Sequence, residues 1–199
     1  MIKISFSGIT GSGKTSLLEE VKKILSLKYR TDSVEEISGK NPFDNDQKAS
    51  FSSQFFYITT QVNEENIHSI NPLDYLLCNR SVLDQWIYWK SSTAGKTLSE
   101  QPEEKNRILE NIYRFWIKTY DLIFLIRLDL KTLDSREYNT EFMKIDAEYI
   151  KKREDLYLQT IKEDNLKVFE IWNNNTVDES AHEIMKTISE YKPLNGAAL

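Results

Sequence analysis

Cysteine is nearly absent from this chain, and long apolar runs are missing. The 199 residues include one cysteine, Cys78, so no disulfide can form within the chain. Because Cys78 ends a short apolar run, we expect a buried thiol that packs as a small hydrophobic side chain. No stretch approaches the roughly 18 apolar residues that a membrane-spanning helix needs, and the N-terminus lacks the apolar core of a signal peptide. These absences predict a cytoplasmic protein with no membrane partner.

Positive charge is also in deficit. The chain has 26 Lys and Arg against 31 Asp and Glu, which gives a formal net charge of −5 and a pI near 5.2. A protein that binds DNA through counterion release usually carries the opposite sign. A nucleic-acid partner is therefore disfavoured, although a local basic patch stays open. At this length we expect one domain over residues 1–192, followed by a frayed tail at 193–199.

Apolar segments and helical periodicities alternate along the chain. Short apolar or alternating segments predict strands at 2–6, 33–37, 73–78, 121–128 and 167–172. Apolar residues at helical spacing predict helices around 17–25, 48–70, 82–89, 108–116 and 177–188. The charged segment 129–164 is expected to be largely helical, with little contribution to the core. Strands that alternate with helices indicate an α/β domain with a parallel sheet covered on both faces.

The strongest motif follows the first predicted strand. Residues 8–15 read Gly-Ile-Thr-Gly-Ser-Gly-Lys-Thr and fit the pattern G-x-x-x-x-G-K-[ST]. Glycines let successive backbone N–H groups turn inward around phosphate oxygens, and the next helix directs its N-terminal donors at the same anion. The motif predicts a site for ATP and Mg²⁺, in which Lys14 reaches the β- and γ-phosphates and the Thr15 hydroxyl binds the metal. The residues expected to bind the nucleotide are Gly8, Thr10, Gly11, Ser12, Gly13, Lys14, Thr15 and Ser16.

Two large classes of phosphate-loop proteins fit poorly. Regulatory GTPases need an Asn-Lys-x-Asp motif and an Asp-x-x-Gly motif, and the sequence contains neither. Remodelling ATPases need a buried strand that ends in Asp-Glu, whereas the strand at 73–78 runs into Asn79 and Arg80. Other classes of phosphate-loop protein are therefore favoured.

Three further segments resemble the nucleoside and nucleotide kinase superfamily, which includes deoxynucleoside and thymidylate kinases. Residues 76–88 read Leu-Leu-Cys-Asn-Arg-Ser-Val-Leu-Asp-Gln-Trp-Ile-Tyr and are similar to the end of the family's third strand. Residues 120–123 resemble the start of its fourth strand, and Arg153-Glu154-x-x-Tyr157 resembles the helix after its lid. The resemblance implies a three-layer α/β/α fold, with a five-stranded parallel sheet in the order 2-3-1-4-5 and a helical lid at about 129–152.

The resemblance also implies roles for residues near the strand ends. Arg80 would contact phosphate of the donor or the acceptor, and Glu36, or its neighbour Glu35, would accept the proton of the acceptor hydroxyl. Asn79 departs from the family, which usually has a carboxylate there, so Asp84 becomes the nearest acid for the metal and a candidate substrate contact.

The acceptor site and the lid are less strongly indicated. The segment 55–61 resembles the helix in which deoxynucleoside kinases read the acceptor base, with Gln61 as the reader and Phe55 as a stacking ring; a core helix with a polar face is the alternative. Arg136 is the candidate lid arginine. Trp86, Tyr88 and Trp89 are expected to pack rather than to clamp a base.

These indications favour an ATP-dependent kinase whose acceptor is a small nucleoside or nucleoside monophosphate. Two alternatives stay open at this point. One is a phosphate-loop kinase that acts on modified bases in DNA, and the other is a nucleotide-binding interaction module without catalysis, which the Asn79 departure supports. The resemblance is also compatible with a homodimer.

Overall fold

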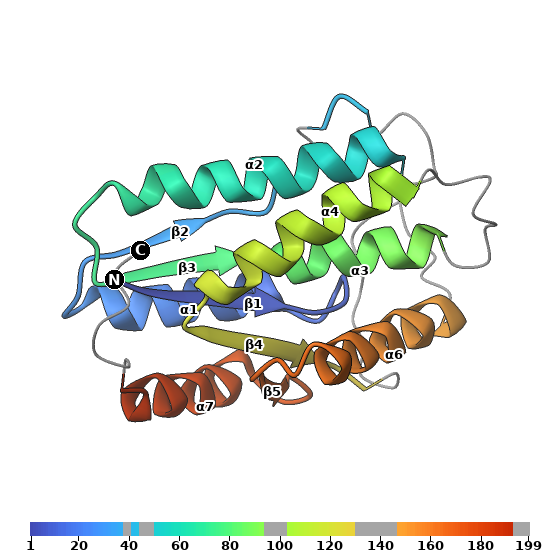
Figure 1. Ribbon diagram of the computed structural model, residues 1–199. Helices are drawn as coiled ribbons and strands as arrows, with labels where there is room; N and C mark the ends of the chain where they lie inside the picture. The colour runs from blue at the N-terminus through green and yellow to red at the C-terminus, as the bar shows by residue number, and fades with distance from the viewer. Residues whose placement is uncertain (38–40, 44–49, 94–102, 130–146, 193–199) are drawn as a thin grey trace.

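The computed structural model describes residues 1–37, 41–43, 50–93, 103–129 and 147–192. Strands and helices alternate along the chain, as the sequence predicts (Figure 1). The strands are β1 (Ile2–Ser7), β2 (Thr31–Val34), β3 (Tyr75–Asn79), β4 (Leu122–Arg127) and β5 (Phe169–Trp172). The helices are α1 (Lys14–Ser26), α2 (Phe51–Ser69), α3 (Val82–Thr93), α4 (Glu103–Trp116), α6 (Ala147–Glu163) and α7 (Val177–Glu190), and a 3₁₀ helix spans Ile117–Thr119.

The five strands form one sheet in the order β2-β3-β1-β4-β5, and every neighbouring pair is parallel. The predicted fold class is confirmed. Strand β1 is central, with Ser5 opposite Cys78 on one side and Ile123 on the other. Because all strands run in the same direction, their carboxyl ends meet at one edge, and the loops that follow β1 and β3 lie next to each other there.

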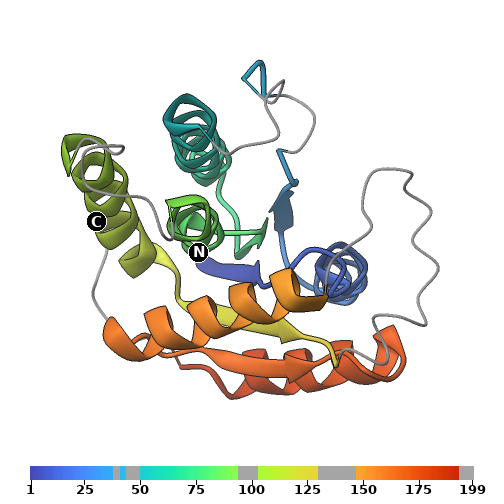
Figure 2. The same ribbon diagram turned by 90° about the vertical axis from the view of Figure 1, so that its right-hand side faces the viewer.

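Helices cover both faces of this sheet (Figures 1 and 2). Alternate strand residues point to opposite faces, so Leu76 and Cys78 pack with α2, α3, α4 and α6, whereas Leu77 packs with α1 and α7. Cys78 is buried and free, as predicted. In the part of the chain that the structure describes, no helix combines the length and the apolar character needed to cross a membrane.

Three elements differ from the sequence prediction. Strand β2 ends at Val34 rather than at residue 37, because its register with β3 stops where Val34 meets Cys78. Helix α2 begins at Phe51 rather than at residue 48, and the Ser50 side chain caps it by accepting a hydrogen bond from the Ser53 N–H. The expectation of little core in the charged segment is wrong for α6, which buries Ile150 and Tyr157 against α3.

Candidate active site

Three glycines shape the loop between β1 and α1. Gly8, Gly11 and Gly13 all have positive φ, at 138°, 84° and 88°. L side chains rarely adopt this conformation, which explains the spacing of glycines in the motif. Gly13 is the N-cap of α1, so the helix begins at Lys14 and its first N–H groups face the loop. The loop and the helix together have the backbone shape that the motif predicts for a phosphate cradle.

Gly8 cannot be replaced without moving the loop. A Cβ atom built on Gly8 would lie 2.4 Å from the Ile126 carbonyl oxygen of β4, and its φ of +138° is unfavourable for alanine. We expect Gly8→Ala to lower the free energy of unfolding by about 2 kcal/mol or more, from backbone strain and the steric clash. Urea denaturation measures this, with Ser16→Ala on the exposed side of α1 as control. A Gly8→Ala loss no larger than that of the control would contradict the close approach.

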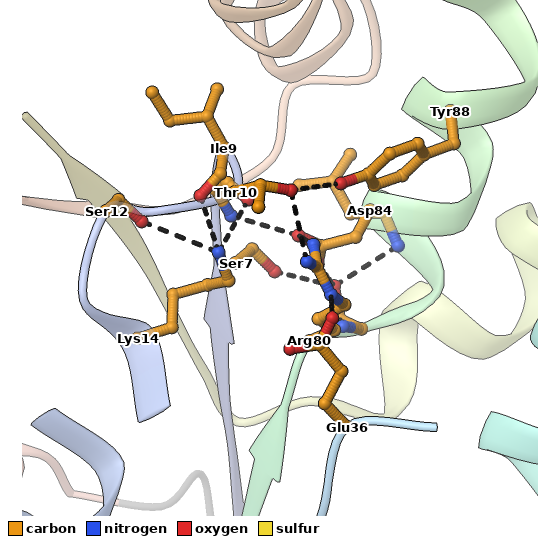
Figure 3. Close-up of polar contacts among 12 residues, drawn as sticks. Ser7, Ile9, Thr10, Ser12, Lys14, Glu36, Arg80, Asp84 and Tyr88 are labelled. Atoms are coloured by element: carbon orange, nitrogen blue, oxygen red, sulfur yellow. Dashed lines mark hydrogen bonds and ion pairs between the residues drawn. The ribbon is translucent and has the colours of Figure 1, made fainter. Parts of the chain in front are cut away.

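Lys14 folds back over its own loop (Figure 3). Its Nζ donates to the carbonyl oxygens of Gly8 at 3.0 Å and Ile9 at 2.6 Å, and lies 3.5 Å from Ser12 Oγ. Burial lowers the pKa of Lys14 to about 7, and the nearby Arg80 charge adds to this effect. The ammonium is thus held where phosphate would arrive, with a proton that is loosely bound until an anion enters.

Asn79 occupies the position beside Thr15. Its Nδ2 donates to Thr15 Oγ1 at 3.0 Å, and its Oδ1 is buried with no hydrogen-bond partner in the described residues. Mg²⁺ prefers oxygen ligands, so the Thr15 hydroxyl and the Asn79 carbonyl fit a cation in ligand type but bring no negative charge. Among the described residues, no group of three or more His, Cys, Asp or Glu side chains could hold a metal.

Asp84 is a fully buried acceptor that ties three segments together. Its Oδ1 accepts from the Gly8 N–H at 3.0 Å and from Tyr157 Oη at 2.8 Å. Its Oδ2 accepts from the Ser81 N–H at 2.8 Å and from Ser81 Oγ at 3.1 Å. These four donors use the four lone-pair positions of a carboxylate. The structure therefore places Asp84 as a support for the phosphate loop, rather than with an oxygen left over for a metal or substrate.

Arg80 points its guanidinium at the phosphate loop from the end of β3 (Figure 3). Its Nε donates to Glu36 Oε1 at 2.7 Å, and one terminal nitrogen donates to Thr10 Oγ1 at 3.4 Å. The other terminal nitrogen, Nη1, lies 3.8 Å from Asp84 Oδ1 and makes no hydrogen bond in the described residues. The guanidinium also lies over the Tyr88 ring, 5.4 Å from its centroid. Arg80 thus keeps donors for an anion at the mouth of the loop.

The backbone of Arg80 is itself constrained. Arg80 has a φ of 83°, in the left-handed region that few non-glycine residues adopt. Its N–H donates to the Phe6 carbonyl at 3.1 Å, and its own carbonyl accepts from Gln61 Nε2 at 3.4 Å. Strained backbone of this kind persists where surrounding contacts hold it, and is typical of functional sites.

The two candidate bases lie in different places. Glu36 bridges to Arg80 and so belongs to the site, whereas Glu35 is exposed and accepts from Ser33 Oγ at 2.7 Å. Both acids follow β2 instead of ending it. The structure brings Glu36, Arg80 and the phosphate loop together and leaves Glu35 apart.

Gln61 is placed behind the site rather than inside it. Its Nε2 donates to Glu65 Oε1 at 2.8 Å as well as to the Arg80 carbonyl. Glu65 is held in turn by an ion pair with Lys3 Nζ at 3.0 Å and by Tyr120 Oη, which donates at 2.6 Å. Gln61 therefore supports the strained Arg80 backbone through a buried polar cluster.

Gln54, in the first turns of α2, is not among the residues that the sequence predicts for the site. Gln54 is buried, and its Oε1 has no hydrogen-bond partner within the described part of the chain. Phe55, the predicted stacking ring, is 39% exposed and stacks on Phe51, with ring centroids 5.6 Å apart. The signal in the sequence was a polar residue at helical spacing from Ile58 and Gln61, on the face that α2 buries.

Three other site residues were not predicted to contact the loop. Tyr88 was expected to pack, but its Oη lies 2.8 Å from Thr10 Oγ1. Tyr157 was noted only as part of a family-like segment, and it reaches Asp84. Asn173, just after β5, is buried and donates from Nδ2 to the Ser12 carbonyl at 2.8 Å. Trp86 and Trp89 are buried, as the packing prediction requires.

The lid prediction falls mostly where the structure gives no description. Arg136, the candidate lid arginine, and most of 129–152 lie outside the described residues. At the two ends of that segment the structure describes Asp129 and the first residues of α6, and the Arg153 guanidinium of α6 lies 3.8 Å from the Tyr88 ring centroid.

A parallel sheet in this order, with a glycine-rich loop between β1 and α1, defines a P-loop NTPase fold. The sequence matches no protein-family model and no curated protein sequence. Its architecture nevertheless resembles that of several solved enzymes.

A deoxyadenosine kinase from M. mycoides, in a structure with the products dCMP and dCDP, aligns with a TM-score of 0.73 and 19% identity over 96% of this chain and 100% of its own. Thymidylate kinase from Candida albicans aligns with a TM-score of 0.65 and 15% identity over 94% of this chain and 91% of its own. Thymidylate kinase from Ehrlichia chaffeensis aligns with a TM-score of 0.66 and 17% identity over 94% of this chain and 98% of its own. The chain therefore has the P-loop fold of the nucleoside and nucleotide kinases.

Proposed function

We propose that this chain is an ATP-dependent phosphotransferase whose acceptor is a nucleoside or a nucleoside monophosphate. The observation that carries the proposal is the convergence of Lys14 and Arg80 on the mouth of the phosphate loop, with Glu36 bound to Arg80. The fold shared with deoxyadenosine and thymidylate kinases supports the choice of acceptor class.

Phosphoryl transfer needs positioning and charge neutralisation more than covalent help from the protein. The loop N–H groups and the N-terminus of α1 would hold the phosphates of ATP. Lys14 Nζ would exchange the Gly8 and Ile9 carbonyls for phosphate oxygens, and Arg80 would offer the transferring group its Nη1, which makes no hydrogen bond within the described residues. Both cations act on charge that develops in the transition state.

Glu36 would orient the acceptor. Because its Oε1 is bound to Arg80, an acceptor hydroxyl that donates to Glu36 would lie beside the phosphate that Arg80 holds. A lid arginine, for which Arg136 remains our candidate, would add positive charge from the opposite side. The acceptor base would be read by Gln54 instead of Gln61. In the part of the chain that the structure describes, the Gln54 carbonyl oxygen has no hydrogen-bond partner, whereas the Gln61 amide donates to Glu65 and to the Arg80 carbonyl.

Thr15 and Asn79 are the residues that would hold Mg²⁺, through the hydroxyl and the amide carbonyl. When bound, the ion neutralises phosphate charge and orients the leaving group.

A second function is favoured by one observation. Asn79 supplies no charge where kinases with this fold are expected to have an acid, which suits a module that binds nucleotide and uses the bound state to regulate a partner. Such a protein would bind ATP and would neither hydrolyse nor transfer its phosphate.

ADP formation from ATP and Mg²⁺ tests the two functions against each other. Nucleosides, nucleoside monophosphates and a modified-base DNA duplex are added one at a time, with a reaction without acceptor as background. We expect one small acceptor to raise turnover well above that background. Stimulation by the duplex alone would favour a DNA-modifying kinase, and ATP binding without stimulation by any acceptor would favour the binding module.

A further inference from the structure

The amide of Asn79 determines the charge around Thr15. Asn79 is 1% exposed, at the carboxyl end of β3, and opposes Phe6 of the central strand. Its Nδ2 is fixed on Thr15 Oγ1 at 3.0 Å, so its Oδ1, which has no hydrogen-bond partner among the described residues, is held next to the first turn of α1. A buried, unpartnered carbonyl is costly, and this one lies where the phosphates and their cation would be.

The neighbouring acids cannot replace the missing charge. Asp84 has all four lone-pair positions occupied by the Gly8 and Ser81 N–H groups and the Ser81 and Tyr157 hydroxyls. Glu36 is paired with Arg80 at 2.7 Å. Either acid would have to break these contacts to reach a cation at Thr15. In the described residues, the cation position is therefore lined by two neutral oxygens.

The same arrangement favours the binding of nucleotide that carries no divalent cation. A carboxylate at position 79 would repel the phosphates unless a cation lay between them, because like charges a few ångströms apart interact strongly in a partly buried site. An amide at this position removes that repulsion. Lys14 and Arg80 remain to face the phosphates, and both are largely buried, where their attraction for an anion is little screened.

We infer that this site binds nucleoside triphosphate nearly independently of divalent cation, and that Asn79 is the residue responsible. The inference rests on the proposed function only in taking ATP as the ligand. It concerns binding, so it holds or fails whether or not the phosphate is transferred. With Asn79 in place of a carboxylate, binding of the triphosphate and binding of the cation become separate events. The triphosphate enters first, and the cation binds weakly afterwards.

Calorimetric titration of ATP into the full chain, with excess Mg²⁺ and again with EDTA, tests this directly. We expect the two dissociation constants to agree within about threefold, and Asn79→Asp to weaken binding in EDTA by about tenfold while keeping most of the affinity in Mg²⁺. Asn66→Asp, on an exposed turn of α2, makes the same charge change away from the site and serves as control. Mn²⁺ titrated into the ATP complex should bind more tightly in Asn79→Asp than in the wild type.

The outcomes separate this inference from the proposed function. A wild-type affinity that falls tenfold or more in EDTA overturns the inference, whatever the variants do. Cation-independent binding without transfer to any acceptor supports the inference and counts against the kinase. Absence of ATP binding in both conditions overturns both. If Asn79→Asp fails to fold, the two wild-type ATP titrations, in Mg²⁺ and in EDTA, and the Mn²⁺ affinity of the wild-type ATP complex still test the inference.

Discussion

Replacing Lys14 with methionine is expected to lower the rate of phosphoryl transfer by a factor of about 10³, as the removal of one preorganised donor does in other enzymes. Methionine keeps most of the volume and the apolar stem but loses the ammonium that would leave the Gly8 and Ile9 carbonyls for phosphate. The measurement is single-turnover transfer to the acceptor identified by the screen, at saturating ATP. Turnover within tenfold of the wild type would show that Lys14 is not the group that stabilises the transferring phosphate.

The pH dependence of binding supplies an independent check on Lys14. Burial lowers its pKa to about 7 in the free protein, and phosphate binds the protonated form and must raise that pKa. Below pH 7 the ammonium is already present, so affinity for ATP should be flat there. Above pH 7 affinity should fall by about tenfold per pH unit until the pKa of the bound state is reached, with uptake of a proton on binding.

Calorimetry in two buffers with different ionisation enthalpies would measure the number of protons that the complex takes up when ATP binds. Lys14→Met should bind ATP more weakly and without the slope above pH 7. A wild-type affinity that does not change between pH 7 and pH 9 would contradict the lowered pKa.

Asp84→Ala is expected to produce the largest loss of stability among single substitutions at the site. The change removes a buried carboxylate that satisfies the N–H groups of Gly8 and Ser81 and the Tyr157 hydroxyl, and it leaves the nearby Arg80 charge without one of its two acids. Breaking a buried charged network in this way costs about 3–5 kcal/mol. Equilibrium unfolding in urea measures it.

Tyr157→Phe is the matched comparison, because it removes one hydroxyl of the same network and keeps the ring in the core. We expect a loss of about 1 kcal/mol, the value of a single hydrogen bond. If Asp84→Ala costs no more than Tyr157→Phe, the carboxylate is not the support that its four donors suggest, and an oxygen of Asp84 becomes available as a metal ligand after all.

Much of the fold could be predicted because it depends on local signals. Buried strands appear as apolar runs, and the phosphate loop appears as glycines that the backbone requires at positive φ. The extent of β2 could not be predicted, since it is set by pairing with β3 and not by its own residues. The buried face of α6 was missed because its apolar residues, such as Ile150, Tyr157 and Ile161, are interspersed with many charged residues.

From the residue pattern alone, the site was predictable only where its parts are adjacent in sequence, whereas Arg80 and Glu36, which the structure brings to the loop, were implied by the family resemblance. Residues 8–15 form a contiguous motif, whereas the support of Gly8 by Asp84 joins residues 76 positions apart. A spacing pattern contains no information about which oxygens of Asp84 are already used, and so the acid nearest in sequence to Asn79 was the natural metal candidate. Gln61 is the predicted reader of the acceptor base because it lies in the family-like segment 55–61, and a spacing pattern does not show that its amide donates to Glu65 and to the Arg80 carbonyl.

The bond between Asn173 and the Ser12 carbonyl joins residues 161 positions apart, and it has a consequence for synthesis of the protein. A ribosome makes the phosphate loop before the residue that anchors its Ser12 carbonyl, because that residue comes after β5. The early chain therefore carries the motif without its finished shape. A ligand stabilises only the state that binds it. ATP is therefore expected to stabilise the completed domain and not the partly synthesised chain.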